Sequence, residues 1–270
     1  MELTKELDAF TDILTERQEH ILRIKINRPQ KKNALTIAMY AAMADAIIQA
    51  DEDGDIRVVF LQGLADCFTA GNDLQDFKDY RPEGELRHAN SFLDAIRRAK
   101  KPIVAAVGGV AVGVGTTMLL HFDLVYAGES AQFQLPFVNL GLCPEAASSF
   151  LLPRLIGHLH ASELLLLGEL FSAAKAREIG LVNAVYPDSE VIDKAYIQAQ
   201  KLAHQPPASV QLTKALLKRP IAEDIAKTME EEMTLFFERL GSAECAEALT
   251  SLLYTSPSPR DYVCYLLWRL

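Results

Sequence analysis

Cysteine is scarce in this chain of 270 residues, and the four cysteines that occur lie far apart. None belongs to a Cys-x-x-Cys pair, so the sequence excludes a zinc framework of that kind and a disulfide scaffold. Structural disulfides belong mainly to oxidising compartments, so their expected absence favours a reducing one. Cys67 and Cys143 stand in apolar surroundings, which predicts packing residues rather than nucleophiles.

Positive charge is also in short supply, with 27 Lys and Arg against 36 Asp and Glu and a net charge of −9. The chain has no long basic run, so binding to nucleic acid or to an anionic membrane is not expected. The N-terminal segment shows neither an apolar signal core nor an Arg-rich transit pattern, so a cytoplasmic location is expected. A native C-terminal signal missing from this sequence would leave a peroxisomal or mitochondrial location open.

Long hydrophobic runs are almost absent, and residues 102–120 come nearest to a membrane span. This stretch carries no charge and contains a GxxxG pattern at Gly109 and Gly113. Its crowded glycines, with His121 and Asp123 directly behind them, favour a buried strand, a glycine turn and a short helix instead. No membrane span is predicted.

Several familiar site motifs are missing. The glycines around Gly113 lack the third glycine of a dinucleotide-binding turn, and neither a phosphate-binding P-loop nor a Gly-x-Ser-x-Gly elbow occurs. His158 and His160 are two positions apart, which does not place two ligands on one helix face. We expect surface histidines and no metal site.

The pattern that is present alternates strands with helices and then becomes helical. Apolar runs predict strands at 21–27, 58–62, 103–107, 123–127, 132–135 and 181–186. Helical periodicity predicts helices at 37–53, 85–100, 192–204, 208–218 and 222–249, with Thr36 and Ser172 as N-caps. The sequence therefore predicts an α/β core over 1–200, a helical region over 201–250 and an anomalous tail over 251–270.

Two glycine-rich turns follow predicted strands, at residues 68–74 and 109–115. Each points backbone amides from a loop into the start of a helix. Two such turns can converge their amides on one oxygen, as an oxyanion hole does. They can equally be tight strand-to-helix turns, which glycine favours in any case. Periodicity does not choose between these readings.

Residues 135–150 contain the most suggestive carboxylate. Pro144 suits the first position of a helix, which would place Glu145 in the first turn, near the positive end of the helix dipole. A glutamate there, between Phe137 and Phe150, is either a general base or a residue that stabilises the helix start. The local pattern alone favours the stabilising role.

Four segments in order resemble the crotonase, or enoyl-CoA hydratase/isomerase, superfamily: NRPQKKNAL at 27–35, FTAGNDL at 68–74, GGVAVGVGTTMLLHFDLVYA at 108–127 and AQFQLPFVNLGLCPEAASSFLLPRLIG at 131–157. FSAAKAREIGLVNAVYP at 171–187 continues the match. The GNDL and PEAASS forms are most similar to Δ3,Δ2-enoyl-CoA isomerases of the peroxisomal type. The resemblance implies a spiral of repeated ββα units, with C-terminal helices that assemble a homotrimer or a dimer of trimers.

The resemblance also implies an acyl-CoA thioester as substrate, and no metal or separate cofactor. The thioester oxygen would be held by the backbone amides of Asn72 and Val114. The coenzyme A portion would lie along Lys31, Lys32, Asn33, Ala34, Leu35, Ala70, Gly71, Asp73 and Leu74, with Phe137 beside the substrate.

Departures from the family pattern indicate which reaction is expected. The two positions at which hydratases of this family carry glutamates hold Thr117 and Phe137 here, and neither side chain transfers a proton as a carboxylate does. Glu145 stands at the isomerase position. Isomerisation of 3-enoyl-CoA to trans-2-enoyl-CoA in fatty-acid β-oxidation is therefore expected, with Phe137 and Phe150 keeping the site dry.

Two other functions stay open at this point: a non-catalytic acyl-CoA binder or scaffold, and a hydratase-like enzyme acting on another acyl-CoA. The resemblance stops after about residue 249. The remaining residues read SLLYTSPSPRDYVCYLLWRL and end in an apolar, β-prone window. This tail is either a foreign sequence or a genuine tail that packs at a subunit interface.

Overall fold

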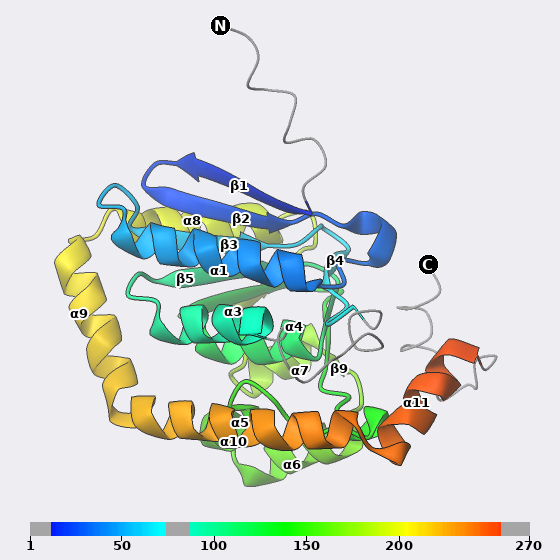
Figure 1. The fold of residues 1–270 in the computed structure, drawn as a ribbon. Coiled ribbons are helices and arrows are strands. Elements are labelled where there is room, and N and C mark those ends of the chain that lie inside the picture. Colours follow the sequence, from blue (N-terminus) through cyan, green and yellow to red (C-terminus); the bar gives the residue numbers. More distant parts are fainter. Residues whose placement is uncertain (1–11, 74–86, 255–270) are drawn as a thin grey trace, which may run out of the picture.

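Six strands form the main sheet, in the order β1-β2-β3-β5-β7-β10 (Figure 1). The computed structural model describes residues 12–73 and 87–254. The strands are β1 (Ile13–Gln18), β2 (Ile21–Ile26), β3 (Val58–Gln62), β5 (Ile103–Val107), β7 (Leu124–Gly128) and β10 (Ala184–Tyr186). β1 pairs antiparallel with β2, and every later pairing in this sheet is parallel.

A smaller sheet lies beside the first one, with its strands in the order β4-β6-β8-β9. Its strands are β4 (Cys67–Thr69), β6 (Val110–Val112), β8 (Gln132–Gln134) and β9 (Phe171–Ser172). β3 leads into β4, β5 into β6 and β7 into β8, so each successive unit adds one strand to each sheet. The predicted fold class, an α/β spiral of ββα units, is confirmed by this topology.

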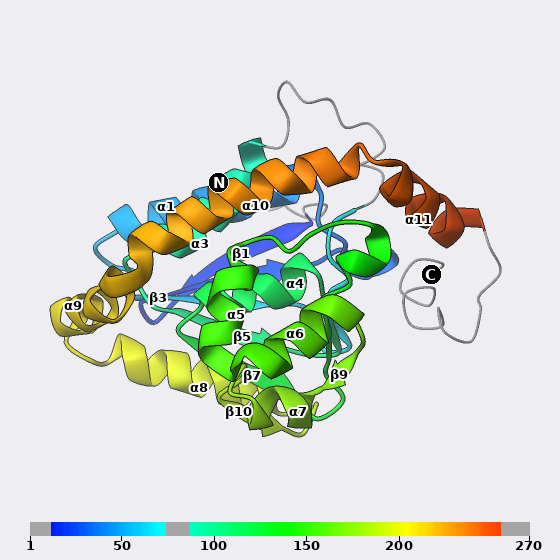
Figure 2. The same ribbon diagram turned by 90° about the horizontal axis from the view of Figure 1, so that it is seen from below.

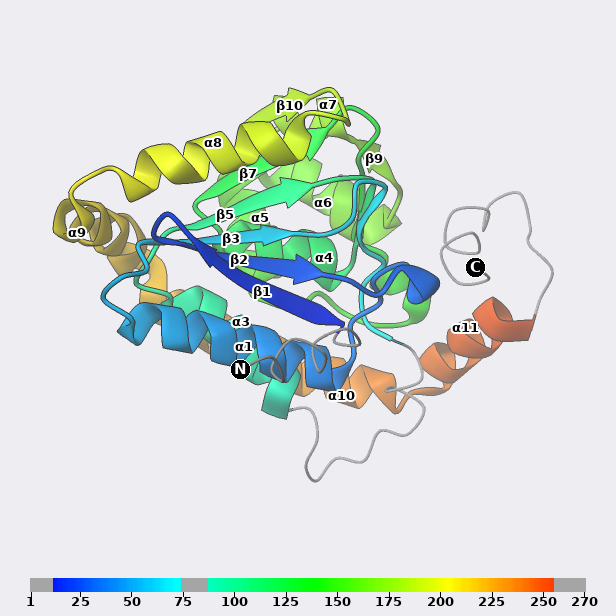
Figure 3. The same ribbon diagram turned by 90° about the horizontal axis from the view of Figure 1, so that it is seen from above.

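Both faces of the main sheet are covered, as Figure 3 shows. Along β3, Val58 and Phe60 face helix α8 (Val191–Ala203), whereas Val59 and Leu61 face the core below α1 (Ile37–Glu52) and α3 (Arg87–Arg98). Alternate residues of a strand point to opposite faces, so a continuous apolar run is required here. This is why the predicted strands at 58–62 and 103–107 are confirmed.

Local signals predicted most of the helices as well. Thr36 caps α1 by accepting a hydrogen bond from the Met39 amide at 3.3 Å, and Ser172 caps α7 (Ala173–Glu178) by accepting one from the Lys175 amide at 3.2 Å. The remaining early elements are η1 (Pro29–Lys31), α4 (Val114–Thr117), η2 (Met118–His121), η3 (Val138–Leu140), α5 (Ser148–Ile156) and α6 (His158–Leu167).

The C-terminal helices run one after another along the outside of the fold (Figures 1 and 2). They are α9 (Pro207–Lys218), η4 (Arg219–Ile221), α10 (Ala222–Leu240) and α11 (Ala243–Tyr254). The prediction of one helix over 222–249 is wrong, because the chain turns at Gly241. After this turn α11 packs on the 138–141 turn, where Gly141 approaches Cys245 so closely that a Cβ would lie 2.8 Å from its nitrogen.

Four strands were not predicted: β1, β4, β6 and β9. β6 was included in the glycine turn, because its three residues lie between Gly109 and Gly113, and β4 and β9 are themselves only three and two residues long. No helix within 12–73 and 87–254 is both long and apolar enough to cross a bilayer. The division at residues 200 and 250 stays a prediction, and most of the tail, 255–270, lies outside the described residues.

Candidate functional site

Glu145 lies in a turn before helix α5 and not in its first helical turn, so that prediction is wrong. The two residues after it, Ala146 and Ala147, have φ values of +58° and +54°, and α5 begins at Ser148. Residues with a Cβ avoid this left-handed region, so tertiary contacts must hold the turn. The Glu145 side chain is 6% exposed, and its Oε1 has no hydrogen-bond partner.

Glu232 of helix α10 supplies one of those contacts. Its Oε2 accepts a hydrogen bond from the Ala147 amide at 2.6 Å, and its Oε1 accepts one from the Ser149 amide at 2.9 Å. The first amides of a helix lack intrahelical acceptors, and a carboxylate satisfies them as an N-cap side chain would. A residue more than 80 positions away therefore caps α5.

His121 holds the same turn from η2. The His121 Nε2–H donates to the Ala146 carbonyl, with 2.8 Å between nitrogen and oxygen. Complete burial lowers the pKa of His121 to about 4, so the ring is neutral at physiological pH and its proton sits on Nε2. Sequence reasoning assigned no role to His121 or Glu232, because no local pattern relates either residue to Glu145.

Burial is also the main influence on Glu145 itself. Burial, together with the smaller effect of the negative charge of Glu232, raises the pKa of this carboxyl to about 8. Bases and acids that work near neutral pH need a pKa in this range. The carboxyl is therefore placed to gain and lose a proton under physiological conditions.

The two glycine-rich turns lie in contact with each other. A Cβ on Gly71 would lie 2.9 Å from the Val112 carbonyl oxygen, and a Cβ on Gly115 would lie 2.5 Å from Cγ2 of Thr69. Gly71 also has a φ of +94°, which disfavours any residue with a Cβ. Glycine at these two positions lets the turns approach as closely as they do.

The Asn72 amide points away from the neighbouring chain segment. Leu35 forms a parallel bridge with Asn72, in which the Leu35 amide donates to the Gly71 carbonyl at 2.8 Å and the Asp73 amide donates to the Leu35 carbonyl at 2.9 Å. These bonds use the groups on either side of Asn72, so its own amide faces the opposite direction. The Asn72 side chain accepts a hydrogen bond from the Tyr40 hydroxyl at 2.5 Å.

The Val114 amide belongs to the first residue of α4, where amides have no intrahelical acceptor. The Gly113 carbonyl accepts from the Thr116 and Thr117 amides instead, at 2.9 and 3.0 Å. Within the described residues, neither the Val114 amide nor the Asn72 amide has a backbone acceptor. Both amides are thus available to a ligand, and their role in an oxyanion hole stays a prediction.

The predicted coenzyme A segment divides into exposed and buried residues. Lys31 is exposed and Lys32 half-buried, whereas Ala34, Leu35 and Ala70 are buried. These buried residues can contact a ligand only through those of their atoms that reach the surface. Leu74 lies outside the described residues.

Asn33 has a structural task that the sequence did not reveal. It is fully buried, and its Nδ2 donates to the carbonyls of Ile26, Cys67 and Phe68 at 3.3, 3.0 and 3.1 Å. Its Oδ1 accepts from the Arg28 amide at 2.8 Å. The side chain thus ties β2 to β4 and sets the position of the loop that carries the lysines.

Asp73 is also engaged within the protein. Its Oδ2 lies 2.6 Å from Nη1 of Arg28, and both side chains are largely buried. Close ion pairs between buried groups fix geometry, since either partner alone would be an uncompensated charge. This pair links the second half of the 68–74 turn to the basic loop.

The hydratase positions hold no proton-transfer group. Thr117 is completely buried, and its Oγ1 donates to the Val114 carbonyl at 3.5 Å within the short helix α4. Phe137 is buried at the start of η3, whereas Phe150 is half-buried with the Arg154 guanidinium stacked on its ring. Phe137 is part of the buried core, and its place beside the substrate stays a prediction. Phe150 faces partly outwards.

Other reactive side chains do not form a second centre within 12–73 and 87–254, where no three His, Cys, Asp or Glu residues gather as metal ligands would. Burial raises the pKa of Cys67 to about 12 and raises that of Cys143, which keeps both thiols protonated. His158 and His160 are exposed on α6, as predicted.

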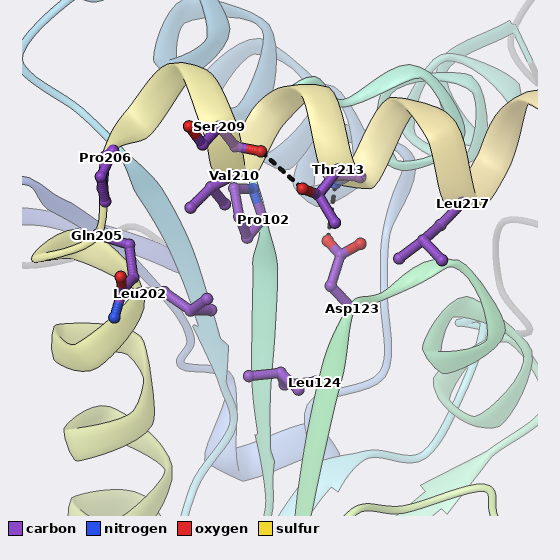
Figure 4. Close-up of a pocket in the computed structure, with 11 residues that line it drawn as sticks. Pro102, Asp123, Leu124, Leu202, Gln205, Pro206, Ser209, Val210, Thr213 and Leu217 are labelled. Carbon is purple, nitrogen blue, oxygen red and sulfur yellow. Dashed lines mark hydrogen bonds and ion pairs between the residues drawn. The ribbon is translucent and has the colours of Figure 1, made fainter.

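A pocket of about 320 Å³ opens between α8, α9 and the sheet (Figure 4), at the amino ends of β5 and β7. The glycine turns lie beyond the carboxyl ends of the strands, which is the edge where ligands bind in α/β sheets. In the pocket, Lys214 Nζ donates to Oδ2 of Asp123 and to the Lys101 carbonyl, both at 2.7 Å. These charges are therefore paired within the protein. Because the pocket lies at the amino ends of the strands, it is separate from the candidate site.

Known proteins are similar to this chain over most of its length. The sequence model of the enoyl-CoA hydratase/isomerase family matches residues 16–257. Enoyl-CoA delta isomerase 2 of Rattus norvegicus is 35% identical over 255 residues, which is 91% of this chain and 64% of that protein. The chain thus spans less than two thirds of the length of that relative.

Relatives with other activities are similar to nearly the same degree. The 2,3-dehydroadipyl-CoA hydratase of Escherichia coli (strain K12) is 31% identical over 245 residues, 90% of this chain and 96% of that protein. The crystal structure of an enoyl-CoA hydratase/isomerase from Pseudoalteromonas atlantica T6c superposes with a TM-score of 0.88 at 40% identity, covering 92% of this chain and 99% of that one. This chain belongs to the enoyl-CoA hydratase/isomerase family.

Proposed function

We propose that the protein isomerises 3-enoyl-CoA thioesters to trans-2-enoyl-CoA, a reaction of fatty-acid β-oxidation. The observation that carries this proposal is Glu145, a buried carboxyl whose Oε1 has no partner and whose pKa is raised to about 8. Relatives that are named enoyl-CoA delta isomerases support it. The protein would thus be an acyl-CoA enzyme that moves a carbon–carbon double bond.

The proposed reaction needs one proton carrier. The ionised Glu145 removes a proton from C2, the C2–H electron pair enters the conjugated system, and negative charge develops on the thioester oxygen. Glu145 then returns the same proton to C4, and the double bond ends between C2 and C3. No electron is gained or lost overall, so the reaction as proposed requires no redox or metal cofactor, and coenzyme A is part of the substrate.

The amides of Asn72 and Val114 are proposed to stabilise the dienolate oxygen. Preorganised donors act most strongly where charge develops, and removal of one such donor in other enzymes costs about 2.7–4 kcal/mol. The contact between the two glycine turns supports this role, since glycine at positions 71 and 115 lets the two segments approach closely. The side chain of Val114 takes no part in the hydrogen bond.

Hydration of the double bond is the activity that the site supports less well. Addition of water needs groups that orient the water and protonate carbon, and Thr117 and Phe137 offer neither a carboxylate nor a base. Glu232 does not replace them, because both of its oxygens already accept backbone amides. The proposed enzyme is therefore an isomerase with little hydratase activity.

The coenzyme A portion is proposed to lie over the exposed side of the basic loop. Lys31 and Lys32 provide positive charge there, in a protein whose net charge is negative. Phosphate groups are bound well by lysines as point charges. The side chains of Asn33 and Asp73 are proposed to contribute indirectly, because they hold the basic loop in position.

The protein is also proposed to assemble from copies of itself, as a homotrimer or a dimer of trimers. Large apolar side chains stand exposed on neighbouring helices α5 and α6 and on α9: Leu155, Leu159, Leu166, Leu167, Leu212, Leu216 and Leu217. Exposed apolar residues that gather on neighbouring helices, as on α5 and α6, are typical of association surfaces. Sedimentation at several protein concentrations tests this, and a monomer throughout would refute it.

A substrate panel tests the proposed function. 3-Hexenoyl-CoA and 3-octenoyl-CoA are supplied in an assay in which coupling enzymes hydrate the trans-2 product and then oxidise the resulting 3-hydroxyacyl-CoA. Crotonyl-CoA is supplied separately to measure hydration. We expect rapid isomerisation and slow hydration. A non-catalytic binder would bind the thioesters without converting them, and a hydratase would prefer crotonyl-CoA; either result would refute the proposal.

A further inference from the structure

Glu232 is a buried acid for which the proposed reaction has no use. It lies on α10 with 6% of its surface exposed, on the face that also buries Ile225 and Phe236. Acidic residues are seldom buried in such a stripe unless they are paired. Burial raises the pKa of Glu232, so its placement has an energetic cost that an apolar residue would avoid.

The partners of Glu232 are backbone amides of the turn that follows Glu145. Through the Ala147 and Ser149 amides, at 2.6 and 2.9 Å, one side chain holds both the second left-handed residue and the start of α5. His121 holds the first left-handed residue, Ala146, through its carbonyl at 2.8 Å. Hydrogen bonds from α10 and from η2 thus both hold the turn.

The hydrogen bonds also determine which of the two neighbouring carboxyls carries the charge. Each amide that donates to Glu232 favours its ionised form, whereas Oε1 of Glu145 has no donor. Two carboxylates close together in a buried site do not both ionise readily. At neutral pH the negative charge therefore belongs to Glu232 and the proton to Glu145.

Other titratable groups near this pair are neutral or are engaged elsewhere. Cys143 precedes Glu145 with a raised thiol pKa, and His121 on η2 is neutral. On α10, Arg239 donates to the Gly141 carbonyl and pairs with Glu244. The cations that act on His121 are Lys218 and Arg97. Glu232 is the charged group whose field acts on Glu145.

We propose that Glu232 is a positioning residue for Glu145: by binding the Ala147 and Ser149 amides it fixes the turn that places the base, and its negative charge keeps a proton on Glu145 in the free enzyme. This inference rests on the proposed function for its kinetic consequences. Only the ionised fraction of Glu145 can remove the C2 proton, and its raised pKa makes that fraction a stronger base than an ordinary carboxylate.

Three variants separate placement from charge. Glu232→Asp keeps the charge but is one methylene shorter, so it cannot hold both amides as Glu232 does. We expect kcat to fall at least about 10-fold, with the apparent pKa of Glu145 still raised. Glu232→Gln keeps the length but loses the charge and one of the two acceptors, so the apparent pKa of Glu145 is the readout that reports the charge. We expect kcat/KM of this variant to fall and the apparent pKa of Glu145 to drop by about one unit or more.

Glu231→Gln is the matched control, because Glu231 precedes Glu232 on the same helix with its side chain 64% exposed. Its kinetics and pH profile should equal those of the unmodified protein. A pH profile for Glu232→Gln that coincides with that of Glu231→Gln would overturn the proposal. If the unmodified protein does not isomerise 3-octenoyl-CoA at all, the proposed function fails instead.

Infrared titration decides the assignment of the proton without a Glu232 variant and without activity. At pH 7 we expect the carbonyl stretch of a buried, protonated carboxyl, and we expect it to vanish in Glu145→Gln. Should the Glu232 variants fail to fold, this comparison still tests the proposal. A band that survives in Glu145→Gln would place the proton on another group and overturn it.

Discussion

Oε2 of Glu232 lies 2.6 Å from the amide nitrogen of Ala147, two residues beyond Glu145. This contact joins the outermost long helix of the fold to the turn that carries the proposed base. It explains why α5 begins at Ser148 rather than at Pro144, and why two alanines adopt left-handed conformations. The C-terminal helices therefore contribute to the site as well as to the outer surface.

The activity should rise with pH. A carboxyl with a pKa of about 8 is protonated below that pH, and only its ionised form can remove the C2 proton. We expect kcat/KM for 3-octenoyl-CoA to increase between pH 6 and 9 and to be half-maximal near pH 8. A profile that is flat over this range, measured with saturating coupling enzyme at each pH, would contradict a raised pKa of Glu145.

Glu145→Gln should stabilise the protein relative to the unmodified chain, and more so as the pH rises. The pKa of Glu145 is higher in the folded state than its ordinary value of 4.5, so the folded state binds more protons between pH 4.5 and about 8. The unmodified protein thus loses stability across that window, by an amount on the order of a few kcal/mol. Glutamine does not ionise and escapes this loss.

Thermal melting at pH 5, 7 and 9 measures this effect. We expect the difference in Tm between Glu145→Gln and the unmodified protein to grow from pH 5 to pH 9. Glu231→Gln serves as the control, and its difference should stay constant with pH. The explanation fails if the two variants show the same pH dependence.

Asn33→Ala should destabilise the fold more than it weakens coenzyme A binding. The substitution removes the side-chain donor to the Ile26, Cys67 and Phe68 carbonyls and puts alanine at a φ of +56°, which should cost about 2–4 kcal/mol in free energy of unfolding. Lys31→Ala should do the reverse, raising KM in a salt-dependent manner with little change in Tm. Denaturant unfolding and KM at two ionic strengths distinguish the two residues.

Gly115→Ala should impair catalysis mainly through one steric contact, because the next atom, the Thr69 carbonyl oxygen, would lie farther from the new Cβ, at 3.2 Å. Its Cβ would lie 2.5 Å from Cγ2 of Thr69, which forces the two glycine turns apart. We expect kcat to fall at least about 10-fold, as a displaced oxyanion donor would cause. Thr69→Ser removes Cγ2 and keeps the hydroxyl that donates to the Asn33 carbonyl, so the double variant should recover activity. Lack of recovery would refute the steric explanation.

Much of the fold could be predicted because its signals are local. The apolar runs of β3 and β5, and the caps at Thr36 and Ser172, depend on a few consecutive residues. The three-residue strand β6 was hidden by its glycines, and the bend at Gly241 follows from packing against the distant 138–141 turn. Short elements and helix breaks are decided by tertiary contacts that a sequence pattern does not contain.

The candidate site shows the same limit. Glu145 was found from its place in a recognisable segment, but the conformation of its turn depends on Glu232 and His121, which lie 87 positions after it and 24 before it. Asn33 was assigned to coenzyme A, whereas the structure uses its side chain to join strands. Residue type indicated the chemistry, and only the fold indicated which side chains were already engaged.

The kinetics of Glu145→Gln on 3-octenoyl-CoA test the central claim most directly. Glutamine keeps the size of the side chain but cannot accept the C2 proton. We therefore expect kcat to fall by about 10²- to 10⁴-fold, while the affinity for trans-2-octenoyl-CoA measured by calorimetry stays within a few-fold of that of the unmodified protein. Isomerisation by Glu145→Gln at the unmodified rate would show that another residue carries the proton.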